Sequence, residues 1–160
     1  MQEQRPPRRK NKRLQGFDYS NMGAYFITIC TEGRQPILWN NLVGAISDRP
    51  CKELSPYGEI VEQAIGSIAL SYPMIVVERY AILPDHIHLL VRIVDMDGRS
   101  LIAPTISTVV RQLKSSISKK CGMPIWQKGF YDHIIRNQKD YEEITIYIAN
   151  NPEKWRQKHM

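Results

Sequence analysis

The sequence predicts an α+β domain, with one antiparallel β-sheet, helices on one face of it and a further helix at the C-terminus. Segments with strand-like alternation or β-branched residues are interleaved with segments of helical periodicity, in the order strand, helix, strand, strand, helix, strand, helix. The length of 160 residues is that of a single domain. The first six elements follow a split βαβ pattern, so we expect a ferredoxin-like (RRM-like) architecture.

The N-terminal half supplies the first strand and the first helix. Residues 23–31 (GAYFITICT) are aromatic and β-branched on both faces, which is typical of a central strand. The pattern also allows a short strand around residues 35–39. Residues 55–71 begin with Ser as N-cap and Pro in the first turn, carry apolar residues at helical spacing and stop before Pro73, which predicts a helix.

The middle of the chain supplies two strands and the second helix. The apolar runs 75–83 and 87–94 predict strands that are interrupted by Pro84-Asp85. The second helix is expected to begin at Pro104-Thr105 and to close at Gly122, with one apolar stripe and basic residues over much of the remainder.

The C-terminal third is expected to add a short strand at residues 133–136 and a third helix from about Gln138 to Asn150. Because proline disrupts a helix interior, Pro152 is expected to stop this helix. Residues 16–160 are therefore expected to form one domain.

The charge is unevenly distributed. The formal net charge is +6, and basic residues crowd the first thirteen positions, so residues 1–15 are expected to form a flexible basic N-terminal arm. Two interpretations stay open, a solvated tail and an arm that lies along a nucleic-acid backbone. The arm's DNA-binding candidates are Arg8, Arg9, Lys10, Lys12 and Arg13.

The composition points away from membranes and secretion. No apolar run approaches the roughly 18–20 residues of a membrane span, and the basic N-terminus lacks the apolar stretch of a signal peptide. The three cysteines are far apart and form no C-x-x-C pair, which is typical of reduced thiols. We therefore expect a cytoplasmic, nucleoid-associated protein without a membrane partner.

The most informative motif is His86-Ile87-His88. Because side chains alternate along a strand, both imidazoles must lie on one face, with Cα atoms roughly 6–7 Å apart. Spacing alone leaves open a metal site and a pair of structural histidines. Zinc would need three protein ligands plus water, or four, whereas two histidines and an amide or carboxylate oxygen suit Mg²⁺ or Mn²⁺.

The last helix carries Tyr147 and Asn151 at an i, i+4 spacing, which places them on one face. Asn151 precedes a proline and is expected to be a C-cap residue. From spacing alone, Tyr147 is better explained as an amphipathic residue at the rim of the core. A tyrosine, an incomplete metal site and a basic surface together suggest phosphodiester chemistry, in which a metal ion assists a phenol whose ordinary pKa is near 10.

Five segments carry a family resemblance. They are GAYFITICT at 23–31, YAILPDHIHLL at 80–90, APTIS through QLK at 103–114, WQKGFYDHIIR at 126–136, and Tyr147-Ile148 followed by Asn151-Pro152. With these segments the chain resembles the REP-associated tyrosine transposases, a branch of the HUH single-strand transposases.

The resemblance implies a role for each candidate residue. His86 and His88 fall on the family's metal-binding histidines, Tyr147 on its nucleophile and Asn151 on the position of the third metal ligand. It implies a divalent ion, Mg²⁺ or Mn²⁺. It also implies cleavage of single-stranded DNA near a hairpin, with the 5′-phosphate held on tyrosine and a free 3′-OH.

Two positions depart from the family pattern. The family commonly has Asn where this chain has Asp85, so the acid is expected either to contact the metal or to cap the turn. Many relatives have His where this chain has Tyr131, which makes Tyr131 a competing tyrosine. We favour Tyr147, because Tyr131 lies in a different element and lacks the Asn partner.

Further DNA contacts are expected from the second helix and the last strand. The candidates are Arg111, Lys114, Lys119, Lys120, His133 and Arg136. The helix residues are equally explained as a solvated face. Stacking on unpaired bases is an option for Trp126, Phe130 and Tyr131, although core packing explains the first two as well.

The sequence therefore predicts a metal-dependent, tyrosine-nucleophile DNA transposase or strand transferase, acting as a monomer or homodimer. Two alternatives remain. One is a non-catalytic nucleic-acid-binding RRM-like module, although the strands lack its aromatic, glycine-rich signature. The other is a zinc metallohydrolase that uses His86, His88 and His133. Whether Tyr147 serves its own chain's histidines or those of a partner is open.

Overall fold

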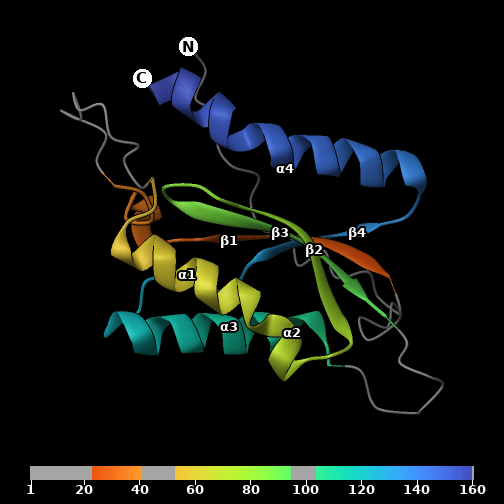
Figure 1. The fold of residues 1–160 in the computed structure, drawn as a ribbon, viewed down its shortest axis with the longest axis horizontal. Helices are drawn as coiled ribbons and strands as arrows, with labels where there is room; N and C mark the ends of the chain where they lie inside the picture. The colour runs from red at the N-terminus through yellow and green to blue at the C-terminus, as the bar shows by residue number, and fades with distance from the viewer. Residues whose placement is uncertain (1–22, 41–52, 95–103, 160) are drawn as a thin grey trace.

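The computed structural model describes residues 23–40, 53–94 and 104–159. The basic arm and its five DNA-binding candidates lie outside the described residues. The elements in chain order are β1 (Ala24–Cys30), the 3₁₀ helix η1 (Glu32–Arg34), α1 (Pro56–Gly66), α2 (Ile68–Ser71), β2 (Ile75–Ile82), β3 (His86–Ile93), α3 (Ile106–Cys121), β4 (Tyr131–Ile135) and α4 (Gln138–His159) (Figure 1).

The four strands form one sheet in the order β2-β3-β1-β4, and every neighbouring pair is antiparallel. This is the strand order of a ferredoxin-like fold, so the predicted fold class is confirmed. β1 lies inside the sheet between β3 and β4, as its two apolar faces predict.

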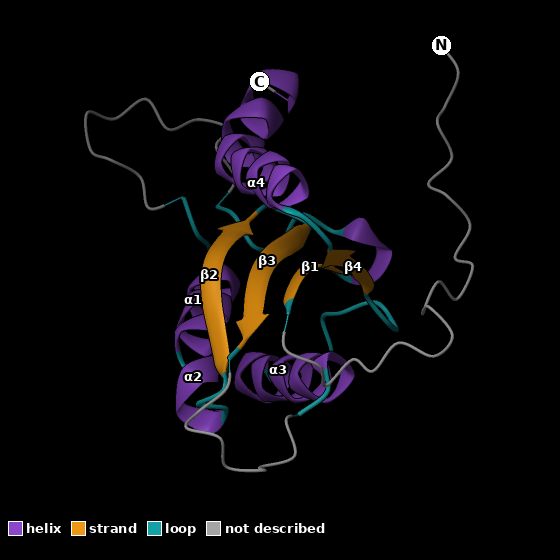
Figure 2. Ribbon diagram, turned by 90° about the vertical axis from the view of Figure 1, so that its right-hand side faces the viewer, coloured by secondary structure: helices purple, strands orange, loops and turns teal. Residues whose placement is uncertain are grey.

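Helices cover both faces of the sheet. α1, α2 and α3 lie on one face and α4 lies on the other (Figures 1 and 2). The core between the sheet and α1–α3 takes alternate residues of β3, which are Ile87, Leu89, Val91 and Ile93. A smaller cluster lies under α4 and consists of Phe26, Ala81, Leu83, Leu90 and Ile148. The side chains of β3 that do not face the main core therefore face α4.

The predicted helix starts are confirmed by their caps. The Ser55 hydroxyl accepts a hydrogen bond from the Gly58 amide at 3.1 Å, and the Thr105 hydroxyl accepts one from the Thr108 amide at 3.2 Å. α3 ends at Gly122, whose φ of 74° is in the left-handed region that favours glycine. Among the described residues, no helix is long and apolar enough to span a bilayer.

Several predicted boundaries were wrong, and the last strand begins at Tyr131 and ends at Ile135 rather than covering residues 133–136. The first helix breaks at Ser67 into α1 and α2. Residues 35–39 form no strand beyond an isolated bridge between Trp39 and Leu54. The last helix continues through Pro152 to His159, so Asn151 lies inside it and is not a C-cap.

Contacts beyond the proline explain why α4 continues. The Trp155 ring packs edge-on against the Trp39 ring at 5.2 Å between centroids, and Arg156 forms an ion pair with Glu53. These contacts hold the last turns of α4 against the domain, and tertiary contacts of this kind outweigh the one backbone hydrogen bond that a proline removes.

Candidate active site

The two histidines of β3 converge on the face of the sheet that α4 covers. Their Nε2 atoms lie 3.1 Å apart, and their ring centroids lie 4.7 Å apart. His88 is only 4% exposed. The prediction that His86 and His88 share one face is confirmed.

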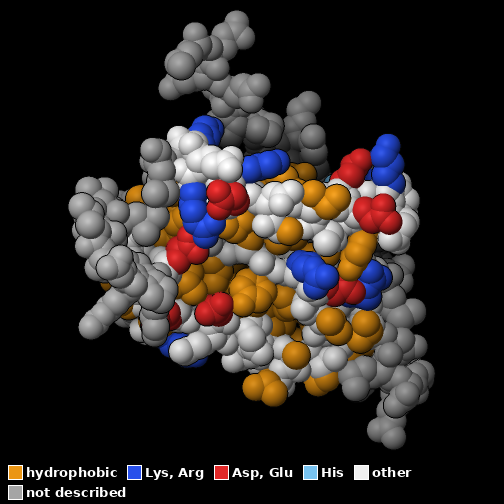
Figure 3. All heavy atoms as spheres, turned by 45° about the horizontal axis from the view of Figure 1, so that its top comes forward, with side chains coloured by type: hydrophobic (Ala, Val, Ile, Leu, Met, Phe, Trp, Pro, Cys, Tyr) orange, Lys and Arg blue, Asp and Glu red, His pale blue; other side chains and the backbone are white. Residues whose placement is uncertain are grey.

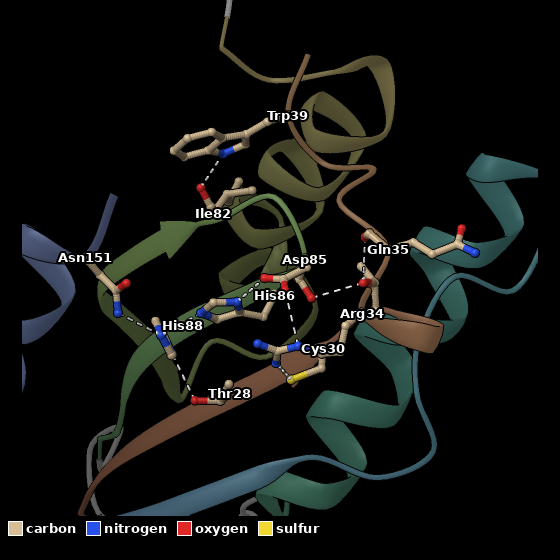
Figure 4. Close-up of polar contacts among 11 residues, drawn as sticks. Thr28, Cys30, Arg34, Gln35, Trp39, Ile82, Asp85, His86, His88 and Asn151 are labelled. Carbon is tan, nitrogen blue, oxygen red and sulfur yellow. Dashed lines mark hydrogen bonds and ion pairs between the residues drawn. The ribbon is translucent and has the colours of Figure 1, made fainter. Parts of the chain in front are cut away.

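A polar side chain orients each imidazole from behind. His86 Nδ1 lies 2.6 Å from the Asp85 carboxylate, and His88 Nδ1 lies 2.8 Å from the Thr28 hydroxyl (Figure 4). Because a carboxylate only accepts, His86 Nδ1 donates its proton to Asp85, and Nε2 is the ring nitrogen that faces His88. Partners of this kind fix ring orientation in metal sites.

Burial sets the charge of this pair. Desolvation by burial is the largest cause that lowers the pKa of His88 to about 3, and the charges of His86 and Arg34 lower it further. His88 is therefore neutral at physiological pH, which is the form that binds metal. Burial acts to raise the pKa of Asp85, but its hydrogen bond to His86 and the charges of His86 and Arg34 outweigh this and hold the pKa below its ordinary value.

α4 brings the tyrosine and the asparagine to the same place. The side-chain amide of Asn151 lies 3.1 Å from His88 Nε2, and the Tyr147 ring lies 5.4 Å from the His88 ring. Phe26 supports both, because its ring stacks on His88 at 5.1 Å and meets Tyr147 edge-on at 6.0 Å. Tyr147 is 47% exposed, so its phenol is accessible to a ligand. One chain holds all four groups together.

The donor set fits a six-coordinate ion. Two ligand atoms 3.1 Å apart match the edge of an octahedron with bonds of about 2.1 Å, which is about 3.0 Å. An amide that turns by 180° exchanges its nitrogen for its oxygen, so Asn151 has an oxygen ligand to offer. His86, His88 and Asn151 are thus the residues able to hold a metal. Within the described ranges, no three His, Cys, Asp or Glu side chains form such a group.

The third histidine of the zinc alternative is engaged elsewhere. His133 Nε2 lies 2.8 Å from the Asp140 carboxylate, at the start of α4. Because His133 does not join the His86–His88 pair in a metal-binding group, the described residues offer no three-histidine zinc site.

Two side chains of the last strand, Tyr131 and His133, are on the same face of the sheet as the histidines. Tyr131 is opposite Thr28 in the sheet register, and its ring meets Phe26 edge-on at 6.5 Å. His133 is opposite Phe26, and Arg136 follows the strand as an exposed residue. Of the DNA-binding candidates, His133 is thus on the side of the site, and Arg136 lies just beyond the end of β4.

The structure does not bring the basic residues of α3 to the site. Arg111, Lys114, Lys119 and Lys120 belong to a helix on the opposite face of the sheet. The Lys114 ammonium donates to the backbone carbonyls of Gln127 and Gly129 at 2.6 and 3.0 Å, which ties α3 to the loop before β4.

Sequence reasoning missed three contributors, which are Phe26, Thr28 and Arg34. Phe26 and Thr28 lie on β1, and they reach the histidines only through the pairing of β1 with β3. A strand read on its own shows which residues share a face but not which strand lies beside it, so no local signal identified them.

Comparisons with known proteins find distant relatives of the chain. No protein-family model matches the chain. A Haemophilus influenzae protein with the provisional name REP-associated tyrosine transposase is 29% identical over 148 residues, which cover 86% of this chain and 74% of that protein. The REP-associated tyrosine transposase of Escherichia coli K12 is 28% identical over 110 residues, which cover 68% of this chain and 62% of that protein.

A solved structure shows the same relationship. A REP-associated tyrosine transposase bound to a REP hairpin matches with a TM-score of 0.62 at 25% identity, over 82% of this chain and 67% of that one. The chain is therefore a distant homologue of the REP-associated tyrosine transposases in sequence and in fold.

Proposed function

We propose that this protein cuts and rejoins single-stranded DNA beside a hairpin, through a covalent link between Tyr147 and a 5′-phosphate, with Mg²⁺ or Mn²⁺ as cofactor. The placement of Tyr147 and Asn151 on one helix above the His86–His88 pair carries the proposal. The distant homology to REP-associated tyrosine transposases supports it independently.

Each residue has a distinct part in this reaction. His86, His88 and Asn151 would hold the metal, while Asp85 and Thr28 keep the two Nε2 atoms aimed at it. The metal would supply Lewis-acid stabilisation of the phosphate charge. The phenolic oxygen of Tyr147 forms the new bond to phosphorus and loses its proton, and the bond from phosphorus to the 3′-oxygen breaks. A later attack by a 3′-OH reverses the link and rejoins DNA.

A single chain supplies the whole set of groups. The contact between the Tyr147 and His88 rings lies within one chain, so the proposed reaction works in cis and needs no second subunit to complete the site. A homodimer remains compatible with this arrangement.

Hairpin DNA is the proposed partner. The solved homologue is a complex with a REP hairpin. On this chain, Tyr131 and His133 are the candidate contacts on the site face, and exposed Arg136 follows them at the end of β4. Arg111, Lys114, Lys119 and Lys120 would instead serve DNA that passes over the opposite face.

The test is formation of a covalent adduct. The protein is incubated with Mn²⁺ and a labelled single strand that carries an inverted repeat flanking its gene, and the products are run on a denaturing gel. We expect an adduct with the wild type, none with Tyr147→Phe and none after chelation by EDTA. Tyr131→Phe is the matched control, because Tyr131 is also exposed and also contacts Phe26, and it is expected to keep the adduct.

Other outcomes would contradict the proposal. An adduct that persists in Tyr147→Phe assigns the chemistry to another residue. DNA binding that is unchanged by EDTA and by His86→Ala, with no adduct under any condition, is the behaviour of a non-catalytic binding module.

A further inference from the structure

Arg34 lies at the end of the histidine pair that is remote from Tyr147. Its Nε is 3.2 Å from the Asp85 carboxylate, whose other oxygen bonds to His86, and its Nη1 donates to the Cys30 thiol at 2.8 Å. Figure 4 shows the resulting row of side chains, which are Asn151, His88, His86, Asp85 and Arg34.

Strand β1 gives the order of these groups along the sheet. Its residues on the site face are Phe26, Thr28 and Cys30, which contact Tyr147, His88 and Arg34 in turn. The strand rise places the first and the last roughly 13 Å apart, with the metal-binding nitrogens between them. Tyr147 and Arg34 therefore flank the site from opposite ends.

Arg34 keeps donors available for a ligand. A guanidinium carries five N–H donors, and the side chain remains 51% exposed despite its contacts with Asp85 and Cys30. A planar guanidinium matches the geometry of phosphate oxygens.

The backbone holds this arginine in a conformation that is rarely adopted. Arg34 has a φ of 56°, in the left-handed region that favours glycine. Its amide donates to the Thr31 carbonyl, and the amide of buried Thr31 donates to the Asp85 carbonyl at 2.9 Å. The Thr31 hydroxyl lies 2.8 Å from the Gln35 carbonyl and 3.1 Å from the Asp85 carbonyl. The strained loop is thus fastened to the turn that precedes His86. Strain of this kind persists where surrounding contacts enforce it, commonly at functional sites.

We propose that Arg34 binds the backbone phosphate immediately 5′ of the scissile phosphate, and so fixes the direction in which the DNA strand crosses the site. This inference rests on the proposed function. The attacking and leaving oxygens of a phosphoryl transfer are roughly in line on opposite sides of phosphorus. Tyr147 attacks from the His88 end, so the 3′-oxygen and the strand upstream of it leave toward the His86 end, where Arg34 lies.

A purely structural role for Arg34, as the ion-pair partner of Asp85, makes a different prediction. It would alter His86 and metal binding, but it would not make one particular phosphate of the DNA more important than its neighbours. The distinguishing quantity is therefore the effect of neutralising a single phosphate.

The experiment measures DNA affinity by fluorescence anisotropy in EDTA, so that no cleavage occurs. The probes are the hairpin strand that forms the adduct and two versions of it. In each version one neutral methylphosphonate replaces the phosphate immediately 5′ or immediately 3′ of the scissile phosphate. The cut is located from the length of the released 3′-OH fragment.

We expect the 5′ methylphosphonate to weaken wild-type binding about tenfold, as loss of one charged hydrogen-bonded contact does. Arg34→Gln should weaken binding to unmodified DNA by a similar factor, and the 5′ methylphosphonate should then cost nothing further. The logarithmic salt dependence of Arg34→Gln should also be shallower by about 0.7. Arg79→Gln removes an exposed arginine of β2 and should respond to the methylphosphonates as the wild type does.

A 5′ methylphosphonate penalty that is the same in wild type and Arg34→Gln overturns the inference. An Arg34-dependent penalty at the 3′ position overturns the strand direction. The wild-type adduct assay on unmodified DNA distinguishes failure of this inference from failure of the proposed function. If the adduct forms but no phosphate contact depends on Arg34, this inference alone is refuted. The absence of any adduct refutes the proposed function and the inference with it.

Discussion

His88 shows how the fold creates a ligand from an ordinary residue. Phe26 stacks on its ring, Thr28 bonds to one nitrogen and Asn151 lies beside the other. Because the ring is almost completely buried, protonation would place a charge away from water, and this is why its pKa is lowered from 6.5 to about 3. The same burial makes the folded state sensitive to acid.

The first prediction follows from that pKa. Between pH 6.5 and about 3 the unfolded chain binds a proton at His88 and the folded chain does not, so stability is full above pH 6.5 and falls as the pH falls. This residue alone should cost about 1.4 kcal/mol per pH unit. Urea unfolding in EDTA, from pH 7 to pH 4, should show a steeper loss of unfolding free energy for the wild type than for His88→Gln.

The comparison uses the difference between the two proteins, so that other titrating groups cancel. Parallel plots of unfolding free energy against pH for wild type and His88→Gln would contradict the account of His88 as a buried, neutral imidazole.

At the scale of elements, α4 is fastened near both ends, with Tyr147 between the two anchors. Near its start, the Tyr141 hydroxyl donates to Glu78 at 2.7 Å, and the same carboxylate accepts from Arg92 at 2.7 Å. Glu78 lies at a register shift between Val77 and Arg79, which is a bulge of the kind that re-aims a side chain.

The second anchor is aromatic. Trp155 packs against Trp39, whose indole nitrogen donates to the Ile82 carbonyl at 2.7 Å at the end of β2. This anchor follows Pro152 and sets the position of the last turns of the helix, including Asn151. The surface over α4 mixes apolar, basic and acidic side chains (Figure 3).

The second prediction concerns this aromatic anchor. Trp155→Ala should destabilise the protein by about 2–3 kcal/mol, less than the roughly 3–5 kcal/mol for truncating a fully buried aromatic residue, because Trp155 is only partly buried. It should also increase hydrogen exchange in the last turns of α4 and reduce adduct formation. Ile146→Ala, on the same helix and 59% exposed, is the control and should change neither hydrogen exchange in these turns nor adduct formation. Unchanged hydrogen exchange in the last turns of α4 in Trp155→Ala would show that these turns do not depend on the aromatic anchor.

At the scale of the whole molecule, the sheet separates two functions. The face toward α1, α2 and α3 carries the larger apolar core, and the face toward α4 carries the polar site. A ferredoxin-like sheet with one face free of the two crossover helices allows this division, because the site does not compete with the main core for side chains.

The sequence was sufficient for the topology and for the shared faces of the two pairs of candidate residues. The order of elements predicts the strand order, and the His86–His88 spacing predicts a shared face. The end of α4 was not predictable from local rules, because it depends on Trp155 meeting Trp39 from a distant part of the chain. Helical periodicity also shows that α3 has a basic side, but not which face of the sheet α3 covers.

The residues that support the histidines can be identified only once the strand register is known. Thr28 and Arg34 carry no motif of their own, and they reach the site only because β1 pairs with β3 and Thr31 binds the Asp85 turn.

The central claim is that Tyr147 is the residue joined to DNA. The adduct is digested with nuclease and trypsin, and tandem mass spectrometry locates the residue that carries the remaining nucleotide. The expected peptide follows Lys139 and contains both Tyr141 and Tyr147, so fragmentation between them discriminates the two. The account predicts the nucleotide on Tyr147 alone, and a nucleotide on Tyr131 or Tyr141 would contradict it.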